Sequence, residues 1–192
     1  MIIGLTGLYC AGKNFIASLF ELRGIPVLDV DKLGHSVIDE KKTEITVRFG
    51  EHILNPDGSV NRRLLGKTVF GNENELSALE NIIHPEVNRQ TDQWIDAQSG
   101  KDCVVNAALI HKSAAFGRLD RIVIVNAPCF IRMIRAKRRD KLPWTVIFRR
   151  LSNQKQFKAQ YLAGKADIYK VENSCCCTDA YLKRQIDVIL SN

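Results

Sequence analysis

The sequence predicts an α/β fold in which helices cover a parallel sheet, and three observations support this prediction. Short apolar runs of strand length alternate along the chain with segments of helical spacing. The first apolar run leads through a glycine-containing turn directly into a helical segment. With 192 residues, 45% of them hydrophobic, the chain is long enough to bury a full core. Strands and helices in alternation imply right-handed crossovers, so we expect parallel strands covered on both faces.

The expected strands and the first helix can be placed from apolar runs and stop signals. Five strands are expected at 2–6, 25–28, 103–105, 121–125 and 168–171. The first helix is expected over 14–22, because Phe15, Leu19 and Leu22 recur at helical spacing and Gly24 then ends the pattern. The sequence therefore predicts a five-stranded parallel sheet.

A long segment between the second and third expected strands, about 32–100, is predicted to be a mostly helical insertion. A turn is expected at 55–58, which reads Asn-Pro-Asp-Gly. Asn61 follows and is expected to cap a helix with Leu64 and Leu65 on one side. An insertion at this place in a doubly wound sheet usually covers the carboxyl ends of the strands, where ligands bind.

A second interruption of the core follows the fourth expected strand. A helix is expected over 130–139, followed by a basic break at 138–143. Pro143 suits the first turn of a further helix that would run to about Tyr161. A helix, a basic turn and a helix at this place predict a mobile lid over about 138–160.

Length and charge limit the domain count and the kind of partner. We expect a single domain, 1–192, with its core formed by 1–31 and 101–192. The formal net charge is +7, but the basic residues are spread along the chain without the aromatic residues of an RNA-binding signature. No apolar run approaches the roughly 18 residues of a membrane helix, and no basic secretory leader opens the sequence. We therefore expect a cytoplasmic protein without nucleic-acid or membrane partners, while its oligomeric state stays open.

The placement of the six cysteines does not predict a disulfide framework. Three of them, 175–177, are consecutive, which suits neither paired disulfides nor a tetrahedral zinc site. Cys10, Cys103 and Cys129 lie in or beside apolar stretches and are expected to be buried thiols in a reducing compartment. The sequence assigns no side chain as a dedicated metal ligand.

The strongest motif lies between the first strand and the first helix. Residues 7–14 match G-x-x-x-x-G-K, except that Asn14 stands where the motif has Ser or Thr. Glycines let main-chain N–H groups converge on phosphate oxygens, the helix N-terminus adds a positive dipole end, and a lysine neutralises the β- and γ-phosphates. The alternative is a structural glycine turn that joins the strand to the helix and binds no phosphate. The predicted ATP-binding residues are Gly7, Cys10, Ala11, Gly12, Lys13, Asn14 and Phe15.

Asn14 bears on magnesium. The hydroxyl usual at this position ligates Mg²⁺, and an amide oxygen can also ligate, but from a longer side chain. We expect magnesium dependence to persist and Asn14→Ser to preserve or raise activity. A large loss on that substitution would mean that Asn14 is co-adapted with its surroundings.

Two carboxylates follow the second expected strand. Asp29 and Asp31 are two residues apart at its carboxyl end, the edge that faces the γ-phosphate in a phosphate-loop fold. A carboxylate there can accept a proton from an acceptor hydroxyl or hold the water shell of magnesium. Equally, Asp31 can cap a helix that begins at Lys32.

Several motifs in this order resemble those of the dephospho-CoA kinase family. The phosphate loop is preceded by G-L-T-G, and D-V-D-K-L-G-H follows at 29–35. An arginine-bearing helix starts near 61–64, and L-E-N-I-I-H-P occupies 79–85. The order continues with Arg139, Asp140, Arg150, Gln154 and the segment 166–173. The resemblance implies a three-layer P-loop NTPase fold with a helical acceptor-binding insertion and a lid.

The same resemblance implies transfer of the γ-phosphate of ATP to the ribose 3′-hydroxyl of dephospho-CoA, with Mg²⁺. It makes Asp31 the base, with Lys13 and Arg139 as the other catalytic residues. It places Asp29, Asp31, His35, Arg62, Arg63 and His84 on the acceptor side. A solvated helix face remains the alternative for the two arginines, and packing or capping before Pro85 remains the alternative for His84.

The sequence departs from the family pattern after the third expected strand. The family reads D-x-P-L-L-x-E there, whereas residues 106–112 read N-A-A-L-I-H-K. Together with Asn14, this leaves two alternatives to a dephospho-CoA kinase. One is a kinase for another small molecule or nucleotide, and the other is a nucleotide- or CoA-binding protein with weakened catalysis.

Overall fold

The sheet has five parallel strands, as the sequence predicts. The computed structural model describes residues 1–152, 166–174 and 177–191. The strands are β1 (Ile2–Gly7), β2 (Val27–Asp29), β3 (Cys103–Asn106), β4 (Arg121–Asn126) and β5 (Asp167–Glu172). They lie in the order β2-β3-β1-β4-β5, and every pairing is parallel. Each strand lies within two residues of its predicted bounds.

The central strands are buried on both faces, which explains why they appear in the sequence as continuous apolar runs. In β1, Ile3 and Leu5 have no exposed surface, and the intervening side of the strand is also covered. All four residues of β3 are buried. Every strand points the same way, so the carboxyl ends of β1, β2 and β3 and the residues after them meet at one edge of the sheet.

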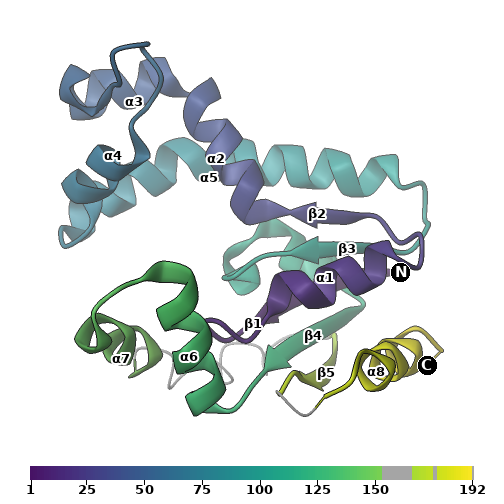
Figure 1. Cartoon of the computed structure of the whole chain (residues 1–192). Helices are drawn as coiled ribbons and strands as arrows, with labels where there is room; N and C mark the ends of the chain where they lie inside the picture. The colour runs from purple at the N-terminus through teal and green to yellow at the C-terminus, as the bar shows by residue number, and fades with distance from the viewer. Residues whose placement is uncertain (153–165, 175–176, 192) are drawn as a thin grey trace. The chain divides into compact units, whose positions relative to one another are not determined.

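The chain forms two compact units. Unit 1 comprises Met1–Asp29 and Ile95–Asn192, and unit 2 comprises Val30–Trp94. Unit 1 contains the sheet and, after the central strands, α6 (Cys129–Asp140) and α7 (Trp144–Ser152). Figure 1 shows these two helices in green, joined by a short connection.

Helices and short turns cover the two faces of the sheet in unit 1. On one face, α1 (Lys13–Glu21) and α8 (Asp179–Ser191) pack side by side on Ile3 and Leu5. On the other face the side chains of Ile110, in η2 (Ile110–Lys112), and of Leu119, just after η3 (Ala114–Arg118), lie against Gly4. A Cβ at Gly4 would come within 2.6 Å of Leu119, so glycine is needed for this close approach.

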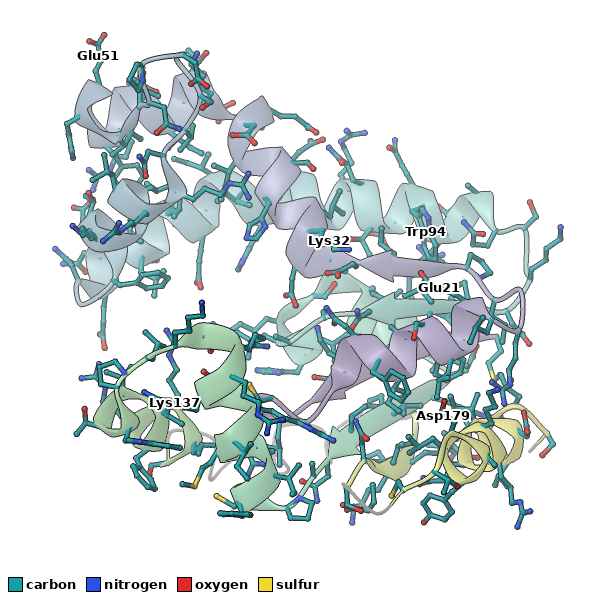
Figure 2. The ribbon with its side chains drawn as sticks, viewed as in Figure 1. Glu21, Lys32, Glu51, Trp94, Lys137 and Asp179 are labelled. Atoms are coloured by element: carbon teal, nitrogen blue, oxygen red, sulfur yellow. The ribbon has the colours of Figure 1, made fainter. Side chains whose placement is uncertain are left out.

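Unit 2 is helical, as predicted for the segment between the second and third strands. It contains α2 (Val30–Glu40), α3 (Lys42–Phe49), η1 (Glu51–Ile53), α4 (Arg62–Val69) and most of α5 (Glu73–Ala97). Its own core is formed by Ile45, Phe49, Ile53, Val60, Leu65, Val69 and Leu79. Figure 2 labels Lys32, Glu51 and Trp94 along this unit.

Two local predictions in unit 2 are confirmed. The side chain of Asn61 accepts hydrogen bonds from the main-chain N–H groups of Arg63 and Leu64, both at 3.1 Å, and so caps α4. The turn at 55–58 is closed by a 2.9 Å bond from the Gly58 N–H to the Asn55 carbonyl.

Three local expectations are wrong. Helix α2 begins at Val30, so Asp31 lies inside its first turn and does not precede a helix that starts at Lys32. Pro85 lies inside α5, which makes the exposed His84 a residue of the helix interior and excludes capping. Cys129 is exposed, and Cys10 is only partly buried, so Cys103 alone of these three thiols is in the core.

The predicted lid falls partly outside the described residues. Its first part is present, since α6 ends at Asp140 and α7 begins after Pro143. The remainder of that prediction, including Gln154 and the helix end near Tyr161, lies outside the described residues, as do Cys175 and Cys176. Among the residues that are described, no helix is long and apolar enough to cross a membrane.

Candidate active site

The phosphate loop has the conformation that its two motif glycines require. It connects β1 to α1, and Gly12 at the helix N-cap adopts a left-handed conformation with φ 94°. A Cβ at Gly12 would come within 2.3 Å of the side-chain nitrogen of Asn173. At Gly7 it would come within 2.9 Å of the Val125 carbonyl oxygen on β4. Both glycines are therefore required by close packing as well as by the motif.

Residues distant in the sequence hold the loop in place. The buried Ala11 carbonyl accepts one hydrogen bond from Nδ2 of Asn173 at 2.9 Å and another from Nη1 of Arg135 at 3.2 Å. Arg135 also donates to the Asn173 carbonyl at 3.1 Å. The N–H of Leu8 donates to the Val125 carbonyl at 3.1 Å. The loop is therefore tied to β4, β5 and α6 before any ligand binds.

The start of α1 suits an anion. Its N-cap residue, Gly12, has no side chain to cap the first turn, and that turn carries no acidic residue. It carries Lys13 instead. Main-chain N–H groups at an uncapped helix N-terminus, together with the helix dipole, favour phosphate.

A tyrosine in the loop joins it to the first part of the lid. Tyr9 donates a hydrogen bond from its hydroxyl to Oδ2 of Asp140, at the end of α6. The guanidinium groups of Arg139 and Arg150 lie 5.3 and 5.6 Å from the centre of the Tyr9 ring. Asp140 also accepts from Nε of Arg139 at 2.7 Å. The structure thus brings the predicted lid arginine, Arg139, next to the phosphate loop.

The charges of this cluster are fixed by their neighbours. The hydrogen bond from Arg139 lowers the pKa of Asp140 below its ordinary value. The same bond raises the pKa of Arg139, and partial burial, reinforced by the bond to Asp140, raises the pKa of Tyr9. At neutral pH the cluster therefore holds one carboxylate, two guanidinium groups and a neutral phenol beside the loop.

The connection between α6 and α7 has its own support. Nζ of Lys137, a residue labelled in Figure 2, lies 5.4 Å from the centre of the Trp144 ring and donates to the Leu142 carbonyl at 2.9 Å. These contacts fix the end of α6, which carries Arg139 and Asp140.

Polar side chains gather at the carboxyl edge of β1, β2 and β3. Asn106 ends β3, is 1% exposed, and lies in register with Asp29 at the end of β2. Its Nδ2 donates to Oδ1 of Asn14 at 3.3 Å. Thr6 of β1, fully buried, donates to the Ala108 carbonyl at 3.1 Å. The edge therefore presents carboxylate and amide oxygens beside the first turn of α1.

A cleft opens beside the loop in unit 1. Its volume is about 400 Å³, and its lining includes Gly12, Phe15, Arg135, Asn173 and Leu182. This lining combines apolar side chains with a guanidinium group, an amide and the carboxylate of Asp179. It suits a flat, partly polar group attached to a phosphate chain.

The predicted acceptor-side residues lie on three helices of unit 2. His35 is on α2, Arg62 and Arg63 open α4, and His84 is on α5; all four are exposed. Nη2 of Arg62 lies 3.8 Å from Oδ2 of Asp39, which follows His35 by one turn of α2. The structure therefore links the start of α4 to the face of α2 that carries His35.

Sequence reasoning missed three residues of the site. Tyr9 occupies a position where the motif allows any residue, and Arg135 lies in a basic helix where several arginines are equivalent. Asn173 ends a family motif, but the sequence does not predict a role for its side chain. The signal available for Arg135 was its spacing of four residues from Arg139, which places the two on one face of α6.

The fold and the loop define a class of protein. A five-stranded parallel sheet with a phosphate loop after β1 and basic side chains beside it is the architecture of P-loop kinases. Residues 1–175 match the family model described as dephospho-CoA kinase. The chain belongs to the dephospho-CoA kinase family, and this makes it an ATP-dependent kinase.

A relative from Treponema pallidum supports this assignment, and two solved structures share the fold. The dephospho-CoA kinase of Treponema pallidum is 32% identical over 200 residues, which cover 99% of this chain and 94% of the relative. The crystal structure of TT1252 from Thermus thermophilus has a TM-score of 0.84 at 27% identity, covering 100% of this chain and 96% of that one. The dephospho-CoA kinase from Campylobacter jejuni shares the fold, with a TM-score of 0.64 at 23% identity, covering 98% and 95%.

Proposed function

We propose that this chain transfers the γ-phosphoryl group of ATP to the ribose 3′-hydroxyl of dephospho-CoA, giving CoA and ADP. The observation that carries the proposal is the phosphate loop, held by Asn173 and Arg135 in a chain that matches the family over residues 1–175. It deepens the family assignment by naming which residues hold each substrate. We also propose a cytoplasmic location, since the four described cysteines carry free thiols, as is typical of a reducing compartment.

ATP is the phosphoryl donor in the proposal. The main-chain N–H groups of residues 7–14 and the ammonium of Lys13 would hold its β- and γ-phosphates. The cleft beside Gly12 would take the adenosine group, with Phe15 and Leu182 against the base and Arg135 and Asn173 as polar partners. Arg135 and Asn173 would therefore serve twice, once for the loop and once for the nucleotide.

Magnesium is the cofactor in the proposal, and the donors at the carboxyl edge fit it. Oxygen ligands are those that Mg²⁺ prefers, and this edge offers the amide oxygens of Asn14 and Asn106 and the carboxylate of Asp29. Oδ1 of Asn106 is buried and has no hydrogen-bond partner among the described residues. When bound, Mg²⁺ neutralises charge on the β- and γ-phosphate oxygens.

The acceptor chemistry is assigned to carboxylates and arginines. Asp31, exposed in the first turn of α2, would take the proton of the ribose hydroxyl, and Asp29 would orient it. Arg139 would stabilise negative charge on the transferring phosphoryl group, which a positioned arginine does in other phosphoryl transfers. His35, Arg62, Arg63 and His84 would bind the anionic parts of dephospho-CoA.

A coupled assay tests the proposal. ADP production is measured with ATP, Mg²⁺ and dephospho-CoA, and in parallel with nucleosides and nucleoside monophosphates as acceptors. Turnover with dephospho-CoA is expected. Turnover only with nucleosides or their monophosphates would assign a different acceptor, and tight binding of ATP without turnover would mean that catalysis has been lost.

A further inference from the structure

Asn14 and Asn106 are two residues at which the chain departs from the motifs of its family, and they are hydrogen-bonded to each other. Nδ2 of Asn106 donates to Oδ1 of Asn14 across 3.3 Å. Asn14 lies in the first turn of α1, and Asn106 ends β3. The bond therefore joins the helix of the phosphate loop to the sheet across 92 residues of sequence.

The burial of Asn106 makes this bond important to it. Asn106 is 1% exposed, and β1 and β2 flank it with Leu5 and Asp29 in register. Its Oδ1 already has no hydrogen-bond partner among the described residues. Loss of the Asn14 side chain would leave the amide nitrogen of Asn106 without this acceptor as well, and an unsatisfied buried amide is costly.

The two positions match each other in donor and acceptor character. Two carboxamides pair, because one donates and the other accepts. A serine at 14 ends one bond shorter, so its oxygen lies further from Nδ2 of Asn106. A carboxylate at 106 puts an acceptor where Nδ2 now donates. Each single change therefore weakens or removes the bond that the two asparagines make.

We propose that Asn14 and Asn106 act as a coupled pair, with Asn106 as the positioning residue that holds the Asn14 side chain at the phosphate end of α1. As a unit they replace a hydroxyl and a carboxylate by two neutral carboxamides. The nucleotide edge thereby loses one negative charge, and the protein attracts a divalent cation less strongly. The charge part of this inference rests on the proposed function, since it takes MgATP as the ligand.

The hydrogen bond between Asn14 and Asn106 changes the expected effect of replacing Asn14 alone. Asn14→Ser, which restores the motif residue, was expected from the motif to preserve or raise activity. Because Asn106 donates to Asn14, Asn14→Ser is expected to lower the stability of the chain by removing that acceptor.

A double-mutant cycle without ligand tests the pairing. Urea unfolding is measured for N14S, N106S and N14S/N106S, and each single substitution is expected to reduce the folding equilibrium constant about tenfold. The double variant is expected to lose clearly less than the product of the two single losses, because the same bond is removed only once. Strict additivity would overturn the proposal.

A matched control uses the neighbouring strand. Asn126 ends β4 and donates from Nδ2 to Glu172 at 2.8 Å. N126S is the same chemical change at the same place in a strand, so N14S/N126S is expected to be additive. Should N106S not fold, N14D decides: it keeps an acceptor oxygen for Asn106 and should retain the stability that N14S loses. Equal losses in N14D and N14S would contradict the pairing.

The charge part is tested by nucleotide binding. The ratio of ATP affinity with Mg²⁺ to affinity without it is measured by titration calorimetry for the parent chain and N14S/N106D. The ratio is expected to rise about tenfold in the double variant, because a carboxylate now faces the cation. An unchanged ratio would overturn this part. A chain that shows coupling in the unfolding cycle but does not phosphorylate dephospho-CoA supports the pair and contradicts only the proposed function.

Discussion

Asn173, the residue that follows β5, donates a hydrogen bond from its side-chain amide to the main-chain carbonyl of Ala11 in the phosphate loop, 162 residues earlier in the sequence. The same amide nitrogen occupies the space next to Gly12, where a Cβ would lie 2.3 Å away. Asn173 is 6% exposed. The far end of the sheet therefore fixes the shape of a loop near the N-terminus.

Asn173→Ala is expected to lower ATP affinity about 2- to 10-fold. The substitution removes one of the two donors to the buried Ala11 carbonyl, and the loss of one hydrogen bond costs about 0.5–1.5 kcal/mol. ATP binding is measured by titration calorimetry. Asn126→Ala at the end of β4 is the control and should bind ATP as the parent does. Equal affinities in all three proteins would contradict a role for Asn173 in the loop.

Tyr9→Phe and Tyr9→Ala separate the two contacts that Tyr9 makes with the lid residues. Phenylalanine keeps the ring under Arg139 and Arg150 but loses the bond to Asp140, whereas alanine loses both. We expect kcat/KM to fall a few-fold in Y9F and about tenfold more in Y9A, since a cation over an aromatic ring contributes about 0.5–2 kcal/mol. If Y9A turns over as fast as Y9F, the ring does not position the arginines.

Asp31→Asn is expected to lower kcat by orders of magnitude and leave ATP affinity nearly unchanged. The amide cannot accept the proton of the acceptor hydroxyl, while the phosphate loop is intact. Steady-state kinetics and a separate ATP titration provide the two measurements. Asp187→Asn, an exposed residue of α8 paired with Arg23, serves as the control. If Asp31→Asn turns over at a near-normal rate, Asp31 is not the base and only stabilises the first turn of α2.

Arg62→Ala is expected to raise KM for dephospho-CoA about tenfold while KM for ATP changes little. The proposal assigns the guanidinium of Arg62 to the anionic acceptor, and an exposed ion pair such as Arg62–Asp39 contributes little to stability. Arg89→Ala, an exposed arginine of α5 paired with Glu86, is the matched control. A parallel rise of both KM values in Arg62→Ala would point to a folding defect.

Acid titration is expected to release the contact between Asp140 and Arg139. The folded-state pKa of Asp140 lies below its ordinary value of 3.8, mainly because Arg139 donates to it. A group with a lowered folded pKa stabilises the fold above its unfolded pKa and loses that contribution as pH falls through the folded pKa. The difference in Tm between the parent and Asp140→Asn should therefore be constant near neutral pH and shrink below about pH 4. A constant difference down to about pH 2.5 would contradict the pairing.

Local sequence patterns predicted much of the fold. Apolar runs predicted all five strands, most clearly β1, β3 and β4, because central strands covered on both faces are buried along most of their length. Asn61 predicted the start of α4, because a capping side chain acts within its own first turn. Pro85 misled, since it suggested a boundary near His84 where α5 in fact continues.

The sequence by itself determined the class of this protein, because a phosphate loop depends on residues that are adjacent in the chain: two glycines, a lysine and the strand and helix that flank them. Only the tertiary structure decided what surrounds the loop. The order of the parallel strands and the position of α6 bring residues from distant parts of the sequence together at the loop. These residues are Asn173, Arg135 and Tyr9. Likewise, Asn14 and Asn106 are two separate exceptions in the sequence and a single hydrogen-bonded pair in the fold, because β3 lies beside β1.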